Sequence, residues 1–311
     1  MKYLFSSILI IITFAASAQT NPPKSMLDWI YPYDTKFIEL SNNIKIAYVD
    51  EGKGKTTLIF IHGLGSYLKA WTKNIDALKT DYRCIALDLP GYGKSSKGDH
   101  EYNISFFSNI IQDFIKKLKL KNVVLVGHSM GGQIALATVL QPNKNIKKLI
   151  LIAPAGFETF SESDRQWFAN INKPLIYKSL PPEQIKRNFE VNFVQFPEDA
   201  HFMLEDRLYM RETAEYDRYC EMIPKCVNGM LQEPVFDDLP NVKLPTLILY
   251  GEKDALIPNR ILHPTLTTLQ VAEAGTKRIP HATLQMLPEA GHFAQWEQAA
   301  LTNAAIRAFL K

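Results

Sequence analysis

The sequence predicts a doubly wound α/β fold, in which helices cover both faces of a mostly parallel sheet. Short apolar or β-branched runs alternate with longer segments of helical periodicity, the pattern of successive strand–helix–strand units. Several runs are apolar throughout, as expected of strands covered on both faces. The chain has 311 residues, of which 46% are hydrophobic and 22% charged, which is enough for a large core.

The expected strands and helices follow one another along most of the chain. Lys36–Leu40 and Ile44–Asp50 alternate in polarity around Ser41-Asn42-Asn43, which predicts a hairpin. Further strands are expected at Thr57–Ile61, Cys84–Leu87, Val123–Val126, Leu149–Ile152, Thr246–Tyr250 and Ala282–Leu287. Helical patterns lie between or after them, at Leu68–Leu78, Ile104–Leu118, Met130–Leu140 and Gln295–Leu310.

The segment 157–244 interrupts this alternation. It has no clear strand, several helical patches and 13 aromatic residues in 88, about 15%, against 11% for the whole chain. We expect this segment to form a helical lid over a site on the main sheet. Residues 19–156 and 245–311 would form the α/β core that contains the sheet. The alternative is an ordinary helical layer that uses its rings as core.

The N-terminal residues predict a secretory signal peptide over residues 1–18. Lys2 is followed by an apolar run from Tyr3 to Ala16, and Ala16-Ser17-Ala18 forms a small-residue cleavage site before Gln19. The alternative is a membrane anchor, but this run is shorter than the roughly 20 residues that a span needs. The cleavage site contains no cysteine, so a bacterial lipoprotein anchor is not indicated. We expect export to the periplasm or the exterior without a stable membrane anchor.

Composition and spacing argue against several other functions. The chain carries 35 Lys and Arg against 32 Asp and Glu, a formal charge of +3, without the basic surplus of a nucleic-acid binder. No His, Cys, Asp or Glu cluster has zinc spacing, and no cofactor is expected. Gly91-Tyr92-Gly93-Lys94-Ser95 superficially resembles a phosphate loop but lacks its four-residue spacer, so we interpret it as a turn beside the site.

The segment from Val123 to Gly132 carries the strongest chemical signal. An apolar strand runs into Gly127-His128-Ser129-Met130-Gly131, a G-x-S-x-G sequence, and a helical pattern follows. A tight strand-to-helix turn would push the Ser129 hydroxyl out at the carboxyl edge of the sheet, while the flanking glycines allow close packing. The alternative is a serine that only caps the helix.

These motifs together resemble the α/β-hydrolase fold family of serine hydrolases, over about Lys36 to Lys311. The matching segments, in chain order, are His62-Gly63-Leu64-Gly65, Asp88-Leu89-Pro90-Gly91-Tyr92-Gly93-Lys94-Ser95, the Ser129 turn, Gly251-Glu252-Lys253-Asp254-Ala255-Leu256-Ile257-Pro258 and Gly291-His292-Phe293. Nucleophile, acid and histidine follow one another in the family's order. The resemblance implies a carboxylic-ester hydrolase of the esterase or lipase branch.

A serine hydroxyl needs a base within hydrogen-bond reach, and the base needs an anion that fixes its tautomer. Of seven histidines, only His292 lies in a Gly-flanked turn between a strand-like run and the terminal helix. Asp254 stands four residues beyond a strand, in a Gly-led loop at the same edge. Glu252 and the pair Asp237 and Asp238 are rivals by charge. The alternatives are a histidine satisfied in the core and an aspartate that caps a turn.

The developing oxyanion needs rigidly held donors. The residue after the nucleophile is Met130, and the resemblance implies that Leu64 supplies the second backbone N–H. His62 and His128 would, by the same resemblance, shape turns rather than exchange protons.

We weigh three functions. The first is hydrolysis of a small-molecule ester with an apolar acyl group, through an acyl-enzyme on Ser129. The second is carbon–carbon bond hydrolysis of a diketone-type substrate. The sequence Gly291–Glu297 resembles the terminal motif of that branch of the family, which favours this function. His128 stands where that branch commonly has Asn, which disfavours it. The third is a non-catalytic binding protein on the same scaffold. Amidase, thioesterase and perhydrolase activities are further alternatives. Haloalkane dehalogenases and epoxide hydrolases of this family are disfavoured, because the resemblance implies Asp at the position of Ser129 in those enzymes.

Cys220 and Cys226 are expected to form a disulfide in an oxidising compartment. Residues six apart in one helix are too distant for a bridge, so this expectation depends on Pro224 ending the helix near Ile223. The alternative is two reduced thiols packed in the lid. Cys84, in an apolar run, is expected to be a buried, inert thiol.

Overall fold

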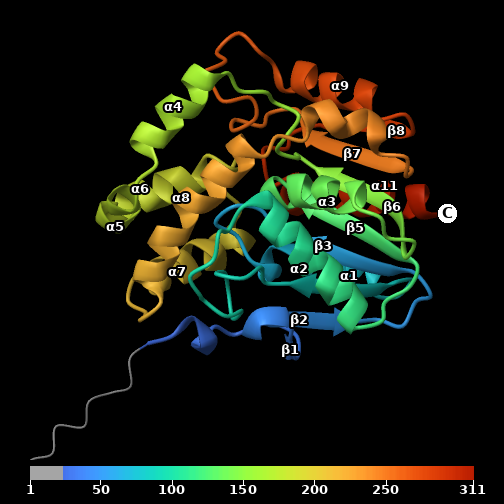
Figure 1. The fold of residues 1–311 in the computed structure, drawn as a ribbon, viewed down its shortest axis with the longest axis horizontal. Helices are drawn as coiled ribbons and strands as arrows, with labels where there is room; N and C mark the ends of the chain where they lie inside the picture. Colours follow the sequence, from blue (N-terminus) through green and yellow to red (C-terminus); the bar gives the residue numbers. More distant parts are fainter. Residues whose placement is uncertain (1–23) are drawn as a thin grey trace, which may run out of the picture.

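The computed structural model describes residues 24–311 and confirms the doubly wound α/β fold (Figure 1). Eight strands form one sheet in the order β1-β2-β4-β3-β5-β6-β7-β8. Strands β3 to β8 are parallel to one another, whereas β2 is antiparallel to both β1 and β4. The strand bounds are Lys36–Glu39, Lys45–Glu51, Thr57–Ile61, Arg83–Leu87, Val123–His128, Ile146–Ile152, Thr246–Gly251 and Ala282–Leu287.

Helices cover both faces of the sheet. Crossovers between parallel strands are right-handed, so the direction in which the chain moves across the sheet decides which face each helix covers. The chain moves one way from β3 to β4 and the other way from β4 to β5 and from β5 to β6. Helix α1 therefore lies on one face, and α2 and α3 lie on the opposite face. In agreement, α1 contacts α10 and α11, while α2 contacts α3. The helix bounds are Thr72–Leu78 for α1, Ile104–Lys117 for α2, Met130–Leu140 for α3, Thr268–Arg278 for α9, Ala294–Glu297 for α10 and Ala299–Leu310 for α11.

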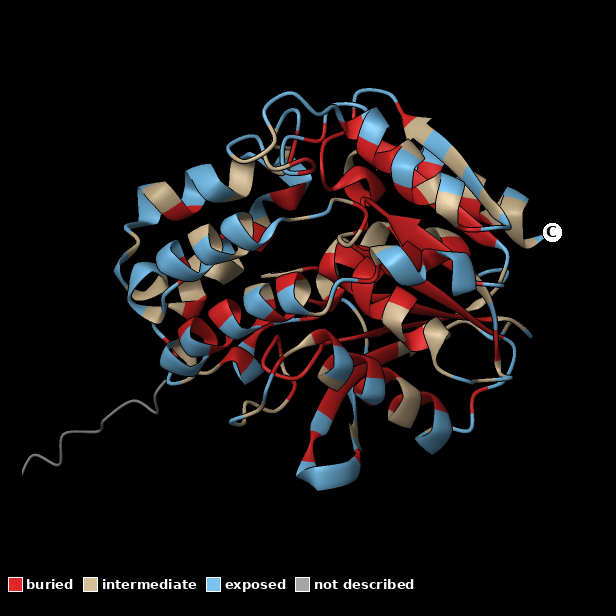
Figure 2. Cartoon of the chain, turned by 45° about the horizontal axis from the view of Figure 1, so that its top comes forward, coloured by how far each residue is buried: buried red, intermediate tan, exposed pale blue. Residues whose placement is uncertain are grey.

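The core is the sheet and the helix faces against it, as Figure 2 shows. Every residue of β3, β5 and β7 is buried, which explains why these strands read as continuous apolar runs. The predicted hairpin is confirmed, and Asn42 and Asn43 occupy the left-handed region with φ values of 59° and 58°, which asparagine tolerates.

Two details of the helices differ from the predictions. The single terminal helix expected over Gln295–Leu310 is divided at Gln298, whose φ and ψ of −113° and 47° are not helical. Helix α9 was not predicted, although Thr267 and Gln270 form a capping box at its start. That box was the signal that could have found it.

The segment 157–244 forms an insertion between β6 and β7, at the left of Figure 1. Within it the structure has no strand, as predicted. It contains α4 (Glu162–Ile171), α5 (Pro174–Ser179), α6 (Pro182–Glu190), α7 (His201–Met210), α8 (Tyr216–Gln232) and a 3-10 helix, η5 (Phe236–Asn241). Its rings serve both expected purposes: Phe157 and Tyr219 are buried in the core, whereas Phe160 and Phe168 line a cavity described below.

The predicted signal peptide, residues 1–18, lies outside the described residues. None of the helices over residues 24–311 combines the length and the apolar character that crossing a bilayer requires.

The expected disulfide between Cys220 and Cys226 is wrong. Helix α8 continues through Pro224, so the two thiols stay six residues apart on one helix, and all three cysteines are free and buried. The missing N–H of Pro224 leaves the Cys220 carbonyl without its helical partner, but the helix is packed on α5, α4 and α2 and continues past the proline. Burial raises the pKa of Cys84 and of Cys226 to about 12.

We therefore expect three reduced thiols that are unreactive in the folded protein, because the thiolate is the reactive form. Unreduced protein that is denatured and alkylated should gain three alkyl groups by mass spectrometry, and native protein should react far more slowly with the same reagent. A single alkyl group per denatured chain would mean that a bridge had formed.

Candidate active site

Ser129 occupies the turn between β5 and α3. Its backbone has a φ of 53° and a ψ of −120°, a region that non-glycine residues rarely adopt. The residue stands at the N-cap position of α3, yet its side chain makes no capping hydrogen bond. No hydrogen bond of its hydroxyl is found among residues 24–311, so the interpretation of Ser129 as only a helix cap is not supported.

The flanking glycines permit this turn because the chain segments around it are very close. A Cβ atom on Gly131 would lie 2.2 Å from the carbonyl oxygen of Ile61, and one on Gly127 would lie 2.4 Å from the carbonyl oxygen of Gly131. Any larger residue would push the helix away from β3 and β5. The predicted reason for the two glycines is therefore confirmed.

His292 and Asp254 are joined by a hydrogen bond, with 2.8 Å between Nδ1 of the imidazole and Oδ2 of the carboxylate. The other oxygen of Asp254, Oδ1, accepts the backbone N–H groups of Leu256 at 2.8 Å and Ile257 at 3.0 Å. Asp254 is fully buried and His292 is 4% exposed. The carboxylate is thus fixed by its own loop, and it holds the ring with Nε2 as the nitrogen that is free for proton exchange.

Two other histidines near the serine are held in structural hydrogen bonds. Nε2 of His62 accepts the Leu89 N–H at 3.0 Å, and its Nδ1 lies 2.9 Å from the Gly63 carbonyl. Burial lowers the pKa of His62 to about 4 and holds the pKa of His128 well below its usual value. His128 Nε2 lies 2.9 Å from the backbone carbonyl of His292, so its ring donates there as a neutral imidazole.

The Gly63–Leu64 segment passes beside the serine. A Cβ atom on Gly63 would lie 3.0 Å from the Ser129 Cβ, so the two backbones approach closely. The Met130 N–H belongs to the first turn of α3, where N–H groups lack helical partners, and in the described chain the Leu64 N–H has no hydrogen-bond acceptor. Both N–H groups that the sequence analysis named are thus available as donors.

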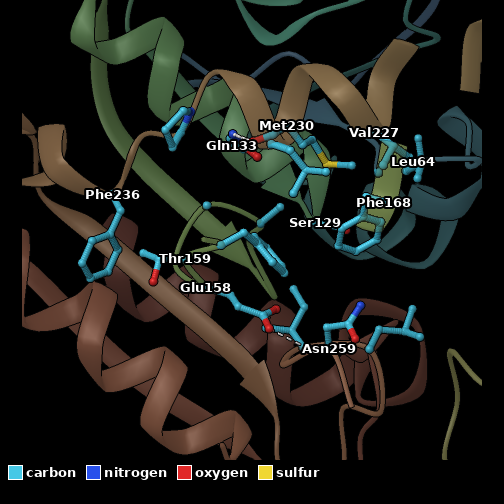
Figure 3. Close-up of a pocket in the computed structure, with 18 of the residues that line it drawn as sticks. Leu64, Ser129, Gln133, Glu158, Thr159, Phe168, Val227, Met230, Phe236 and Asn259 are labelled. Atoms are coloured by element: carbon cyan, nitrogen blue, oxygen red, sulfur yellow. Dashed lines mark hydrogen bonds between the residues drawn. The ribbon is translucent and has the colours of Figure 1, made fainter. Parts of the chain in front are cut away.

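One cavity of about 500 Å³ brings most of the predicted site residues together (Figure 3). Leu64, Ser129 and His292 line it, while Asp254 lies behind His292 and Met130 is buried at the start of α3. Apolar side chains from the insertion and from the loop after β7 form much of the wall, among them Phe168, Val227, Met230, Phe236 and Leu256.

Among residues 24–311, Asp254 is the only carboxylate that pairs with the His292 ring, and none of the rival carboxylates contacts it. Glu252 is exposed at the end of β7, and the exposed Asp237 forms an ion pair with Arg278. Neither geometry brings a carboxylate to the His292 ring, for which Asp254 is the partner.

The loop Gly91–Ser95 surrounds a carboxylate rather than a phosphate. Asp88 is completely buried, and its carboxylate accepts hydrogen bonds from the Lys94 N–H at 2.8 Å, the Leu68 N–H at 2.9 Å and the Tyr31 hydroxyl at 2.6 Å. This carboxylate ties the loop to the segment that follows β3, which makes the loop a structural turn near the site, as predicted.

Several polar residues that were not predicted from the sequence also line the cavity. Gln133, Glu158 and Asn259 all contribute to its wall. No periodicity or motif marks Glu158 or Asn259, because they lie in loops after β6 and β7 that only the sheet order brings together. Within residues 24–311, no group of three or more His, Cys, Asp or Glu side chains is arranged to hold a metal ion.

Comparison with known proteins gives several matches. A family model described as the alpha/beta hydrolase fold matches residues 56–299. The chain is 31% identical over 267 residues to the dihydrolipoyllysine-residue acetyltransferase component of the acetoin cleaving system from Pseudomonas putida, a match that covers 84% of this chain but only 65% of that protein. It is 28% identical to a 2-hydroxy-6-oxononadienedioate/2-hydroxy-6-oxononatrienedioate hydrolase from Escherichia coli, over 88% of this chain and 93% of the relative.

Among solved structures, the chain is similar to a membrane phospholipase A described as a bacterial virulence factor. The TM-score is 0.74 at 25% identity, over 89% of this chain and 85% of the other. Because the family model covers most of the chain, and the sheet order and the Ser129 turn agree with it, the chain belongs to the alpha/beta hydrolase fold family.

Proposed function

We propose that the protein is a serine hydrolase that cleaves carboxylic esters of small molecules. The observation that carries this proposal is the position of Ser129: its hydroxyl is free of capping at a strained turn and shares one cavity with His292, whose ring is held by Asp254. A weak nucleophile next to an oriented base is the arrangement that acyl transfer requires.

In the proposed mechanism, Ser129 Oγ attacks the acyl carbon while His292 Nε2 takes its proton. The carbonyl π electrons move to oxygen, and the Leu64 and Met130 N–H groups stabilise that oxyanion. Collapse of the tetrahedral intermediate expels the alkoxide, which receives the proton from His292. Water, activated by the same ring, then hydrolyses the acyl-enzyme and restores Ser129, while Asp254 stabilises each imidazolium.

The charges of the cavity wall favour an ester over a dianionic diketone. The name of the Escherichia coli relative describes substrates with two carboxylates. Among the described lining residues, Arg165 is the only Lys or Arg, and its guanidinium already donates to Glu162 and to the Phe160 carbonyl. Glu158 adds a carboxylate to the wall, and the carboxylate of Asp237 is paired with Arg278. A dicarboxylate would therefore lose hydration without finding a free cation.

We further propose that the insertion, residues 157–244, acts as a lid and that it sets acyl chain preference. Phe168, Val227 and Met230 come from α4 and α8 of this insertion and present apolar surface to the cavity. Apolar groups at this position would bind an apolar acyl chain through burial of its methylenes, worth roughly 0.8 kcal/mol each.

We also propose that the protein is exported, with cleavage after Ala18. The pattern of residues 2–18 supports this, with its positive start, apolar run and small-residue site. N-terminal sequencing of protein recovered from the periplasm or medium should begin at Gln19. Recovery of the full chain, starting at Met1, from the cytoplasm would contradict export.

Replacing Ser129 with Ala should abolish ester turnover, because the hydroxyl forms the covalent bond. We expect kcat to fall by about 10⁴-fold or more, measured on a panel of nitrophenyl esters from short to long acyl chains with a diketone control. A fluorophosphonate should label wild type at Ser129 and leave the variant unlabelled. The exposed Ser163→Ala on α4 is the matched control and should keep both properties. Turnover of the diketone but of no ester would favour the carbon–carbon hydrolase instead.

Val227→Trp should shorten the preferred acyl chain, because the larger ring would fill part of the cavity below α8. We expect the ratio of kcat/KM for long over short chains to fall about tenfold, as when roughly two methylenes lose their burial. Gln232→Trp, at the exposed end of the same helix, should keep the wild-type ratio. An unchanged chain-length profile in a folded Val227→Trp protein would argue against the lid as the determinant of chain length.

A further inference from the structure

A second polar cluster lies on the cavity wall, apart from the three residues of the proposed triad. Glu158 belongs to the segment after β6, and Asn259 and His263 belong to the loop after β7. In the view of Figure 3, Glu158 and Asn259 lie below the cavity, and Val227 and Met230 lie above it. The Glu158 side chain is only 7% exposed, an unusual position for a carboxylate.

The two oxygens of Glu158 have different surroundings. Oε1 accepts the Asn259 backbone N–H at 2.8 Å and lies 2.5 Å from Nδ1 of His263. Oε2 has no hydrogen-bond partner within residues 24–311, although it is not sealed off from the cavity. Since each carboxylate oxygen accepts up to two hydrogen bonds, the wall presents one acceptor that is open to the cavity and has no protein partner among the described residues.

An oxygen in this position is available to a molecule that enters the cavity. Burial raises the pKa of Glu158, and the hydrogen bonds from His263 and Asn259 oppose that rise. Oε1 by itself ties the two loops together, so loop structure accounts for one oxygen only. A donor on a bound molecule that replaces water at Oε2 would form a hydrogen bond to a charged group, which is stronger than one between neutral groups.

The surroundings select the kind of donor. The ring centroid of Phe160 lies 5.3 Å from that of His263 and 5.6 Å from that of Phe168, so much of the wall near Glu158 is apolar. An ammonium group would lose more hydration than a neutral hydroxyl on entering such surroundings, which favours the hydroxyl.

We propose that Glu158 is a specificity-determining residue whose Oε2 accepts a hydrogen bond from a hydroxyl group on the substrate. The preferred substrate class is then an ester whose acyl chain is apolar except for one hydroxyl. This inference rests on the proposed function, because it takes the acyl chain to occupy the cavity that Ser129 opens to.

The test compares kcat/KM for methyl esters of ω-hydroxyalkanoic acids with kcat/KM for unsubstituted methyl esters that have the same number of chain atoms. A range of chain lengths is used, and the rate is measured by titrating the acid that each ester releases. Wild type should prefer the hydroxy ester at the matching length by about tenfold or more, as expected for a hydrogen bond to a charged group. In Glu158→Gln, whose Oε1 can still tie the loops while an amide NH₂ replaces the free oxygen, this ratio should fall about tenfold.

Glu273→Gln is the matched control, because Glu273 lies on α9, is paired with Lys277 and does not line the cavity; it should keep the wild-type ratio. Circular dichroism and Tm check that Glu158→Gln is folded. An equal rate on both esters in wild type, or an unchanged ratio in Glu158→Gln, would overturn the proposal. A stronger preference for ω-amino esters would overturn the assignment of a hydroxyl.

A binding measurement separates this inference from the proposed function. Methyl ketones matched to the two ester series can be titrated into Ser129→Ala and into the double variant Ser129→Ala, Glu158→Gln by calorimetry. If no ester is hydrolysed but the hydroxy ketone binds more tightly only when Glu158 is present, the proposed function fails and the role of Glu158 stands. Equal affinities for the two ketones would overturn the role of Glu158.

Discussion

The strained backbone of Ser129 is the constraint on which the rest of the site depends. A non-glycine residue at φ 53° and ψ −120° persists only if its surroundings fix it. Here the surroundings do fix it. The Ser129 N–H donates to the Ile152 carbonyl at 3.0 Å, and the Ser129 carbonyl accepts the N–H groups of Gly132 and Ala155 at 2.8 and 3.0 Å. Strands β5 and β6, helix α3 and the loop after β6 are thereby joined at one residue, and the hydroxyl is left without a local partner.

Parallel packing then brings the remaining groups to the same place. The carboxyl ends of β3, β5, β7 and β8 lie at one edge of the sheet, so the loops after them carry Leu64, Ser129, Asp254 and His292 together. Hydrogen bonds cross between these loops: Asp254 holds the His292 ring at 2.8 Å, and the His128 ring donates to the His292 carbonyl at 2.9 Å. Two neutral, buried imidazoles, His62 and His128, shape this edge without competing for the proton, because burial holds each pKa below its usual value.

The insertion gives the site its chemical character. The core edge supplies polar groups, whereas α4 and α8 supply rings and aliphatic side chains to the cavity wall. The carboxylate of Glu158 interrupts this apolar surface close to Asn259. A cavity with a nucleophile, a largely apolar wall and a carboxylate acceptor at Glu158 is suited to recognise a substrate by both its length and a polar substituent.

The sequence by itself determined the fold class, the strands from Lys36 onward and the order of the chemical motifs, because periodicity and glycine spacing are local properties. It also singled out Ser129, Asp254 and His292, and the structure brings His292 to Asp254 and to the cavity of Ser129. Tertiary structure decided what local patterns could not. Packing carried α8 through Pro224 and kept Cys220 and Cys226 apart, and the sheet order brought Glu158 to Asn259 across 101 residues of sequence. Contacts between distant segments depend on burial and topology, which no short window of residues contains.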